Sequence, residues 1–264
     1  MRLSHGALAA LAACSGASSH APDDPDAATT IDAAIDAAVV DVDGDGLDDA
    51  YEAQLANDYL PFLSLDPNDG CKRSGLAVRV RKHPADATKI LVIYDHLFET
   101  DCGLNGHTGD NEAFGVVIDP TKPAPAGILA IKTASHQNTP CEKITECSTC
   151  GDGRPACEKQ SGVPILYASK DKHGQYAMKC STFGTCFDTC TLAMTAHRPP
   201  IVNVGEPMGH LVTNLTTQGF INAMNGWTKP ELMNVDPWAP GDFGSAGNVA
   251  DDLVDPVFVP APCP

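Results

Sequence analysis

Cysteine is the residue type that most constrains the fold of this chain. Ten of the eleven cysteines lie after residue 70, concentrated in "CEKITECSTCGDGRPAC" and "CSTFGTCFDTC". An even number of closely spaced cysteines is typical of a disulfide framework in an exported protein. Zinc is the alternative, because Cys147 and Cys150 have C-x-x-C spacing, but a structural zinc site usually has a second, similarly spaced pair. We therefore predict a disulfide-braced domain, with the pairing left open.

The start of the chain predicts export. Met1 and Arg2 precede "GALAALAAC", a short apolar segment that is typical of a secretory signal and too short to span a bilayer. Residues 11–14, "LAAC", resemble a bacterial lipobox, in which the cysteine is diacylated and begins the mature protein. The resemblance implies a lipid anchor on Cys14; the alternative is an ordinary signal with an incidental cysteine. We expect a lipoprotein of the cell envelope, held at the outer membrane, or a secreted protein.

Composition divides the chain into four parts. Residues 1–14 are the predicted lipoprotein signal peptide, and residues 15–40, rich in Ala and Asp, are a predicted disordered acidic spacer. Residues 41–60 hold a predicted calcium loop and the helix after it, and residues 61–264 form the main domain. The net charge of −17 argues against nucleic acid as a partner and suits cations.

The main domain has the pattern of a β protein. The whole chain of 264 residues has 23 Gly and 21 Pro, which predict many turns. Between the turns lie runs rich in Ile and Val, such as "KILVIYDHLFE" (89–99) and "NEAFGVVID" (111–119), which are typical of strands. We predict an all-β dominated fold, a β-sandwich, with one short helix near its N-terminal end.

The most specific local motif is "DVDGDGLDDAYE", residues 41–52. It fits the D-x-D-x-D-G pattern with a Glu at position twelve, in which oxygen atoms at fixed spacing surround Ca²⁺. The predicted ligands are Asp41, Asp43, Asp45, the Leu47 carbonyl, Asp49 and Glu52. The alternative is an acidic, solvated continuation of the spacer. A single loop that resembles those of thrombospondin type 3 and dockerin-like repeats implies a structural clip more than a regulatory sensor.

A helix should follow this loop. Leu47, Tyr51, Leu55 and Tyr59 recur every four residues and would form one apolar stripe. Pro61 predicts the end of the helix, because the residue before a proline disfavours the helical conformation.

The stretch "GHTGDNEAF", residues 106–114, predicts a second cation site. If the strand starts near Asp110, then Asp110 and Glu112 point to the same face, because side chains alternate along a strand. His107, in the preceding loop, could fold back over that face. A set of mostly oxygen ligands suits Ca²⁺ or Mg²⁺ better than zinc. The alternative is a solvated surface loop.

This stretch resembles the heptapeptide motif of the necrosis- and ethylene-inducing-peptide-like proteins and a motif of a related vacuolar-sorting-associated group. The resemblance, patchy over residues 50–245, implies a central β-sandwich and a cation site at His107, Asp110 and Glu112. It also implies a further acidic ligand at Glu99 or Asp101. The chain departs from the motif where Thr108, Gly109 and Asn111 replace Arg, His and Trp. From "ILYASKDKHGQYA" (165–177) the resemblance adds Lys172, His173 and Tyr176 as site neighbours.

Three function classes remain open from the sequence. The first is a binding or membrane-interacting module that uses the cation to hold a glycan or lipid headgroup, with the lipid anchor as its membrane contact. The second is a metal-dependent hydrolase, with His173 as proton shuttle beside a metal-bound water. The third is a purely structural envelope protein. The sequence leaves open whether the chain is an enzyme.

Overall fold

The computed structural model describes residues 40–41, 44–83, 85–106, 108–136, 140–180, 187–190, 195–199 and 201–203. All of them belong to one compact unit, Val39–Pro264. The predicted signal peptide with Cys14 and the predicted spacer up to residue 39 lie outside the described residues, as do Asp43 and His107.

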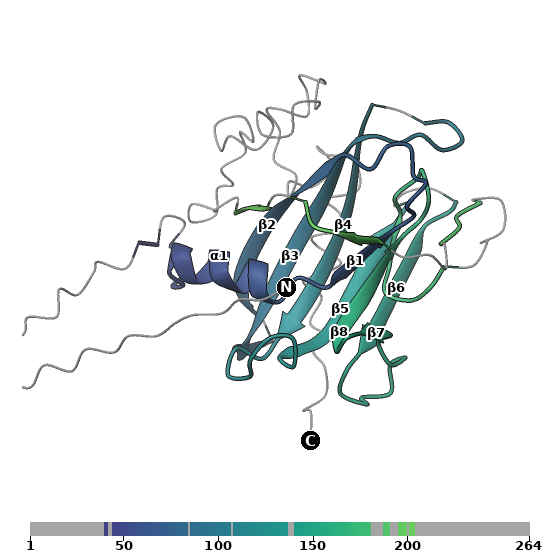
Figure 1. The fold of residues 1–264 in the computed structure, drawn as a ribbon. Helices are drawn as coiled ribbons and strands as arrows, with labels where there is room; N and C mark the ends of the chain where they lie inside the picture. The colour runs from purple at the N-terminus through teal and green to yellow at the C-terminus, as the bar shows by residue number, and fades with distance from the viewer. Residues whose placement is uncertain are drawn as a thin grey trace, which may run out of the picture. The chain divides into compact units, whose positions relative to one another are not determined.

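The predicted fold class is confirmed: the chain is mostly β-sheet, with two sheets and one short helix in its described part (Figure 1). The helix is α1 (Asp49–Asp58). The strands are β1 (Phe62–Leu65), β2 (Ser74–His83), β3 (Asp86–Thr100), β4 (Thr108–Ile118), β5 (Ile128–Ser135), β6 (Lys143–Ser148), β7 (Lys159–Gln160), β8 (Val163–Ala168), β9 (Gln175–Tyr176), β10 (Thr195–His197) and β11 (Ile201–Asn203).

The larger sheet has the strand order β11-β2-β3-β4-β5-β6, and β2 to β6 form a continuous antiparallel meander. The smaller sheet has the order β10-β1-β8-β7, with β9 also paired to β8. Its central pair, β1 and β8, is parallel, and the chain between them builds the larger sheet, which provides the long connection that a parallel pair needs. The two sheets enclose a shared hydrophobic core.

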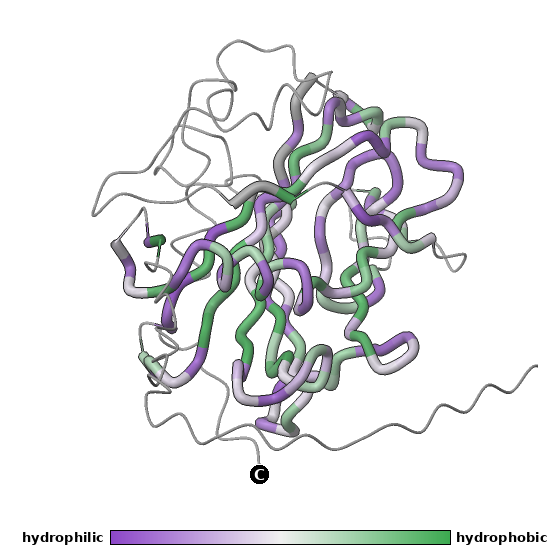
Figure 2. The backbone as a smooth tube through the Cα atoms, turned by 60° about the vertical axis from the view of Figure 1, so that its left-hand side comes forward, coloured by the Kyte–Doolittle hydropathy of each residue, from purple (hydrophilic) through white to green (hydrophobic). Residues whose placement is uncertain are grey.

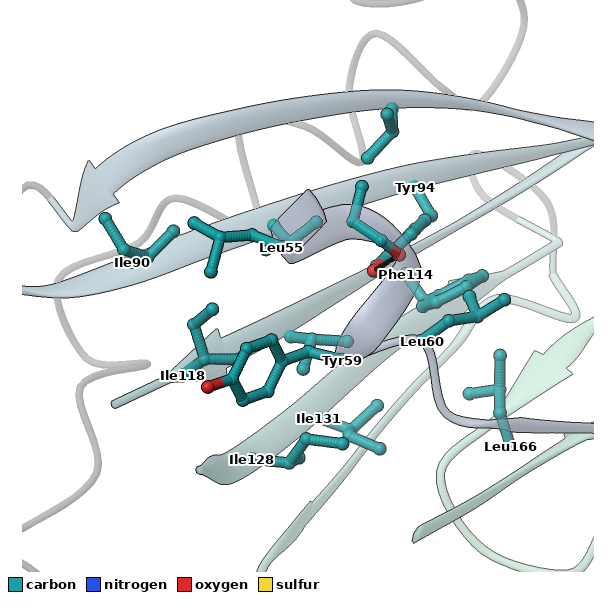
Figure 3. Packing of buried hydrophobic residues seen from close by; sticks show 14 of the residues in the cluster. Leu55, Tyr59, Leu60, Ile90, Tyr94, Phe114, Ile118, Ile128, Ile131 and Leu166 are labelled. Carbon is teal, nitrogen blue, oxygen red and sulfur yellow. Dashed lines mark hydrogen bonds between the residues drawn. The ribbon is translucent and has the colours of Figure 1, made fainter. Parts of the chain in front are cut away.

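The core follows from alternation along β3 and β4. Tyr94 pairs with Phe114 across the two strands, and their rings stack with centroids 4.8 Å apart. Val92 and Ile90, before Tyr94 on β3, and Val116 and Ile118, after Phe114 on β4, are also apolar and buried in the same cluster. Figure 3 shows these side chains gathered between the sheet and α1. Along the backbone, hydrophobic segments follow the strands and hydrophilic ones gather in the loops (Figure 2).

Helix α1 forms where the sequence predicts a helix. Asp48 is its N-cap, and the Asp48 carboxylate accepts hydrogen bonds from the backbone N–H groups of Ala50 and Tyr51. Leu55 is buried in the core, but Tyr51, which the predicted stripe included, is 38% exposed. No helix in the described part of the chain is long and apolar enough to cross a membrane.

Disulfide bonds join loops at several places, as predicted. The pairs are Cys71–Cys102, Cys147–Cys157 and Cys180–Cys190, and Cys141 and Cys150 are also disulfide-bonded. Because Cys147 is bonded to Cys157, the C-x-x-C pair does not form a zinc site. Cys186 and Cys263 lie outside the described residues.

The cap of α1 is testable by substitution. Asp48→Ala removes the acceptor of two otherwise unpaired N–H groups at the start of the helix, and should lower the free energy of unfolding by about 1 kcal/mol. Asp58→Ala, at the last helical residue, is the matched control and should change it by less than about 0.5 kcal/mol, since a carboxylate is unfavourable at that end. Urea unfolding measures both; equal losses would contradict the capping role.

Candidate functional site

Two carboxylates lie buried at one end of the larger sheet. Asp110 pairs with Phe98 across β3 and β4, and Glu112 pairs with His96. The β4 strand starts at Thr108, so Asp110 and Glu112 lie two residues apart on the same face. They are 7% and 5% exposed, which is unusual for carboxylates unless they are paired.

His173 is the partner that the structure brings to Asp110. The His173 Nδ1 atom lies 3.0 Å from Asp110 Oδ2, and its Nε2 atom lies 3.4 Å from Asp69 Oδ1. The His173 ring stacks on Phe98 with centroids 3.7 Å apart and the planes nearly parallel. We call Asp69, Phe98, Asp110 and His173 the histidine clamp. Its members come from three separate parts of the chain.

The turn that carries His173 has an unusual backbone. Asp171 and His173 have φ angles of 63° and 59°, in the left-handed region that non-glycine residues rarely adopt. Asp69 holds this turn, because its Oδ2 atom accepts a 2.8 Å hydrogen bond from the Asp171 N–H group. Asp171 returns the contact, and its Oδ1 atom accepts a 3.1 Å hydrogen bond from the Gly70 N–H group. The strain is therefore offset by contacts that fix the imidazole.

In the histidine clamp, the imidazole and the carboxylates stabilise one another's charged forms. Burial lowers the pKa of His173, but the hydrogen bonds to Asp110 and Asp69 outweigh it and raise the pKa to about 9. Burial likewise raises the pKa of Asp69, and the hydrogen bonds from His173, Asp171 and Cys71 outweigh it, so that this pKa is lowered. His173 is thus an imidazolium at neutral pH, held between two carboxylates and against the Phe98 ring, an arrangement that also favours a cation.

Glu112 has no such cationic partner among the interactions that set its pKa. Burial is the largest cause that raises the pKa of Glu112 well above its usual value, followed by the negative charges of Asp110 and Asp188. A hydrogen bond from the Gln175 backbone N–H group acts in the opposite direction but is weaker. Either a proton or a cation is needed to relieve the repulsion between Glu112 and Asp110.

A chain of hydrogen bonds lies beside the clamp. The Gln175 Nε2 atom donates to the His173 carbonyl (2.9 Å) and lies 3.3 Å from His96 Nδ1. Ser74 Oγ lies 2.8 Å from His96 Nε2 and 2.5 Å from His197 Nε2. Because Gln175 donates at both contacts, His96 carries its proton on Nε2 and donates to Ser74. His96 therefore has the wrong tautomer to act as a general base toward that hydroxyl.

Burial controls the protonation of these two histidines. It is the largest cause that lowers the pKa of His96 well below its usual value, and the pKa of His197 to about 4. The positive charge of His173 contributes to both shifts. The site therefore concentrates its one imidazolium on His173.

A further buried acid, Asp188, lies near the same end. Asp188 Oδ2 accepts hydrogen bonds from His136 Nε2 and from the Tyr176 hydroxyl. Burial raises the pKa of Asp188, but these two hydrogen bonds outweigh it and lower the pKa. The Cys180–Cys190 disulfide anchors the segment that brings Asp188 to this place.

The predicted central cation site is placed only in part. Asp110 and Glu112 are both buried at one place, while His107 lies outside the described residues. Among the residues that the structure describes, no group of three or more His, Cys, Asp or Glu is arranged to hold a metal ion. The donor set of two carboxylates fits a hard divalent cation only if a third donor completes it. That site stays a prediction.

The upstream acids lie elsewhere. Glu99 follows Phe98 on β3 and so points to the opposite face from the clamp, where its carboxylate pairs with Arg73 at 3.2 Å. Asp101 Oδ1 accepts a 2.6 Å hydrogen bond from the Gly103 N–H group. The structure therefore places Glu99 on the opposite face of β3 from Asp110, and the upstream acidic ligand that the resemblance implied stays a prediction.

The predicted calcium loop has a compact turn around its first residue. Asp41 Oδ1 accepts hydrogen bonds from the N–H groups of Gly44 (2.8 Å) and Asp45 (3.1 Å), and Asp41 Oδ2 accepts one from Gly46 (2.9 Å). Gly46 has a φ of 83°, which only glycine adopts readily. Leu47 is buried in the core, so the loop is attached to the domain.

Two of the predicted calcium ligands meet at one cation of the protein. Arg81 Nη1 lies 3.2 Å from Asp45 Oδ2 and 3.7 Å from Glu52 Oε1. The carboxylates of positions five and twelve thus converge on the Arg81 guanidinium. Asp49 is the first residue of α1, and Asp43 lies outside the described residues. Calcium binding by this loop stays a prediction.

Comparisons with known proteins leave the family open. No protein-family model matches the chain, and no curated protein matches it. The chain is similar to a solved structure described as "Toxin fold for microbial attack and plant defense", at 16% sequence identity and a TM-score of 0.39. The match covers 78% of this chain and 90% of that chain. This likeness is too weak to assign a family or an activity.

The charge of His173 leads to a pH-dependent stability. Its pKa is raised in the folded protein, so the stabilisation is complete below the unfolded value of about 6.5 and is lost as the pH rises through about 9. In chelator-containing buffer, the difference in unfolding free energy between wild type and His173→Gln should shrink over this range. Urea unfolding at several pH values measures it, and a constant difference would mean that His173 is neutral when folded.

Proposed function

We propose that the protein is an exported binding module that uses a divalent cation, held at Asp110 and Glu112, to bind a polar headgroup or sugar. The observation that carries the proposal is the burial of these two carboxylates on the same face of β4. His107 would complete the donor set from the loop before the strand. The cation would bridge these protein oxygens and the hydroxyl or phosphate oxygens of the ligand.

The energetics favour a cation at this place. Positions two residues apart on a strand are separated by about 7 Å, and two carboxylates at that spacing would repel by roughly 2 kcal/mol at an effective dielectric constant of about 20. Burial adds a desolvation cost. His173 neutralises Asp110 from one side but is shared with Asp69, so Glu112 keeps the larger part of this cost. Ca²⁺ or Mg²⁺, which prefer carboxylate oxygen, would remove it.

The calcium loop would act as a separate, structural site. Asp41 already organises the loop, and Asp45 and Glu52 already face one another across Arg81. A bound Ca²⁺ would connect the start of the domain to α1, next to the cap at Asp48. The lipid anchor at Cys14, a place in the cell envelope and the spacer of residues 15–40 belong to the same proposal, and would hold the binding module away from a membrane.

Calorimetric titration of the chelator-treated protein with Ca²⁺ and with Mg²⁺ tests both sites. Wild type should show two separable binding events, one of them selective for Ca²⁺. Asp110→Asn should lose the central event and keep the loop event, while Asp45→Asn should do the reverse. Asp86→Asn, which removes the carboxylate at the first residue of β3, is the matched control and should keep both events.

The outcomes separate the two sites. If Asp110→Asn titrates like wild type, the central site is wrong, whatever the loop does. If no variant changes the heat, the carboxylates are structural and the proposal fails as a whole. Thermal unfolding of each variant without added metal checks that a lost event reflects a lost ligand and not a lost fold.

A further inference from the structure

We propose that a pocket on the outer side of the same end of the sheet binds the phosphate group of a small molecule. The pocket lies between the segment that leads into β2 and the end of β3. Its lining residues are Gly70, Cys71, Lys72, Arg73, Glu99 and Thr100. This site goes beyond the cation proposal and does not depend on it, since it uses neither Asp110 nor Glu112.

The pocket has the size of a small-ligand site. Its volume is about 310 Å³, at the lower end of the range of roughly 300 to 1,000 Å³ found for small-molecule pockets. That volume suits a phosphorylated glycerol or a single sugar phosphate better than a large cofactor. A ligand of this kind has one strongly charged group and a small polar remainder.

The walls of the pocket are fixed before any ligand binds. The disulfide Cys71–Cys102 joins the segment before β2 to the chain just after β3. The Glu99 N–H group donates a 3.0 Å hydrogen bond to the Arg73 carbonyl, which extends the pairing of the two strands to the pocket. A pocket that is already formed loses little conformational entropy on binding, so that modest contacts suffice for affinity.

Two adjacent cations line this pocket. The chain has 17 basic and 34 acidic residues, so the adjacent Lys72 and Arg73 form a positively charged patch in a protein of net negative charge. Lys72 Nζ donates a 2.8 Å hydrogen bond to the Pro67 carbonyl, and an ammonium group has two further N–H groups to donate. Arg73 offers a planar fork that matches the oxygens of phosphate.

The Arg73–Glu99 ion pair marks where an oxyanion fits. Arg73 Nη1 lies 3.2 Å from Glu99 Oε2, and the two side chains are 49% and 32% exposed. Exposed pairs of this kind contribute only about 0.2 to 1 kcal/mol, so a ligand can displace the carboxylate readily. Glu99 thus acts as an internal competitor of the ligand at Arg73.

The other adjacent basic pair in the described chain shows the contrast. Arg81 contacts the carboxylates of Asp45 and Glu52, and Lys82 Nζ donates to the Gly46 carbonyl. Those cations serve the loop before α1. The Lys72–Arg73 pair, facing a formed cavity with one displaceable carboxylate, is the place where the structure favours an external anion.

The acid-rich composition favours a soluble phosphate over a membrane. A net charge of −17 repels an anionic bilayer, whereas a small phosphate monoester can enter one pocket against that field. The same phosphate chemistry occurs in free metabolites and in lipid headgroups, so the experiment has one arm for each source.

Titration of the purified full chain with sn-glycerol 3-phosphate, in chelator-containing buffer, tests the pocket. Wild type should bind, and Arg73→Gln should weaken binding by roughly tenfold or more, as expected for a lost charge-assisted hydrogen bond. Glu99→Gln should tighten binding by about two- to fivefold, because the competing carboxylate is gone. Co-sedimentation with phosphatidylcholine vesicles, with and without phosphatidic acid, forms the second arm.

The opposite signs make the test specific. Arg73→Gln and Glu99→Gln break the same ion pair, so a merely structural effect would move the affinity in the same direction for both. Lys143→Gln and Glu142→Gln make the same charge changes near the far edge strand β6 and should leave the affinity unchanged. Arg73-dependent binding to phosphatidic-acid vesicles alone would keep the site and assign its ligand to a lipid. Absence of Arg73-dependent binding in both arms would overturn the proposal.

Discussion

The antiparallel pairing of β3 with β4 is the constraint on which both the core and the candidate site depend. One register places Tyr94 against Phe114 in the middle of the sandwich and Phe98 against Asp110 at its end. Since side chains alternate, the face that is apolar in the middle becomes polar at the end without any break in the strands. A slip by one residue would turn both the core and the two carboxylates to the wrong face.

Three loops meet at the polar end of the sheet: the first leads into β2, the second follows β3 and the third leads into β9. Hydrogen bonds and ion pairs between these loops hold this end together. Asp69, on the first loop, binds both His173 and the backbone of Asp171 on the third. The second loop joins them, since the Cys102 N–H group donates to the Asp171 carbonyl and Cys102 is bonded to Cys71. The imidazolium of His173 is therefore at the centre of these contacts. The Cys71–Cys102 disulfide links the first and second loops and so lowers the entropy cost of bringing the loops together.

Sequence patterns predicted the parts of this protein whose interactions are local. The strand run at 89–99 lies within β3 and the run at 111–119 overlaps β4, and α1 begins at Asp49, inside the loop motif. The same patterns put Tyr51 on the buried stripe of α1, although the four-residue spacing drifts around the helix and leaves this side chain exposed.

Contacts between residues that are far apart in the sequence could not be predicted from such patterns. Asp69 lies 104 residues before His173, and "DPND" has the composition of an ordinary turn. His96 looks like a strand residue in a hydrophobic run, and only its pairing with Glu112 shows that it faces the polar end. The family resemblance pointed to His173 and placed the extra acid at Glu99 or Asp101, of which alternation along β3 turns Glu99 to the opposite face.

That alternation gives the end of the sheet two sides with opposite electrostatic character. On the inner side, Asp69, Asp110 and Glu112 surround a single imidazolium, so the carboxylates outnumber the cation. On the outer side, Lys72 and Arg73 face one carboxylate, so the cations are in excess. Ser74 and Phe98 point inward while Arg73 and Glu99 point outward, and consecutive residues of β2 and β3 thus serve both sides. A cation held inside and an anion held outside would attract each other across a single strand layer, so each would favour the binding of the other.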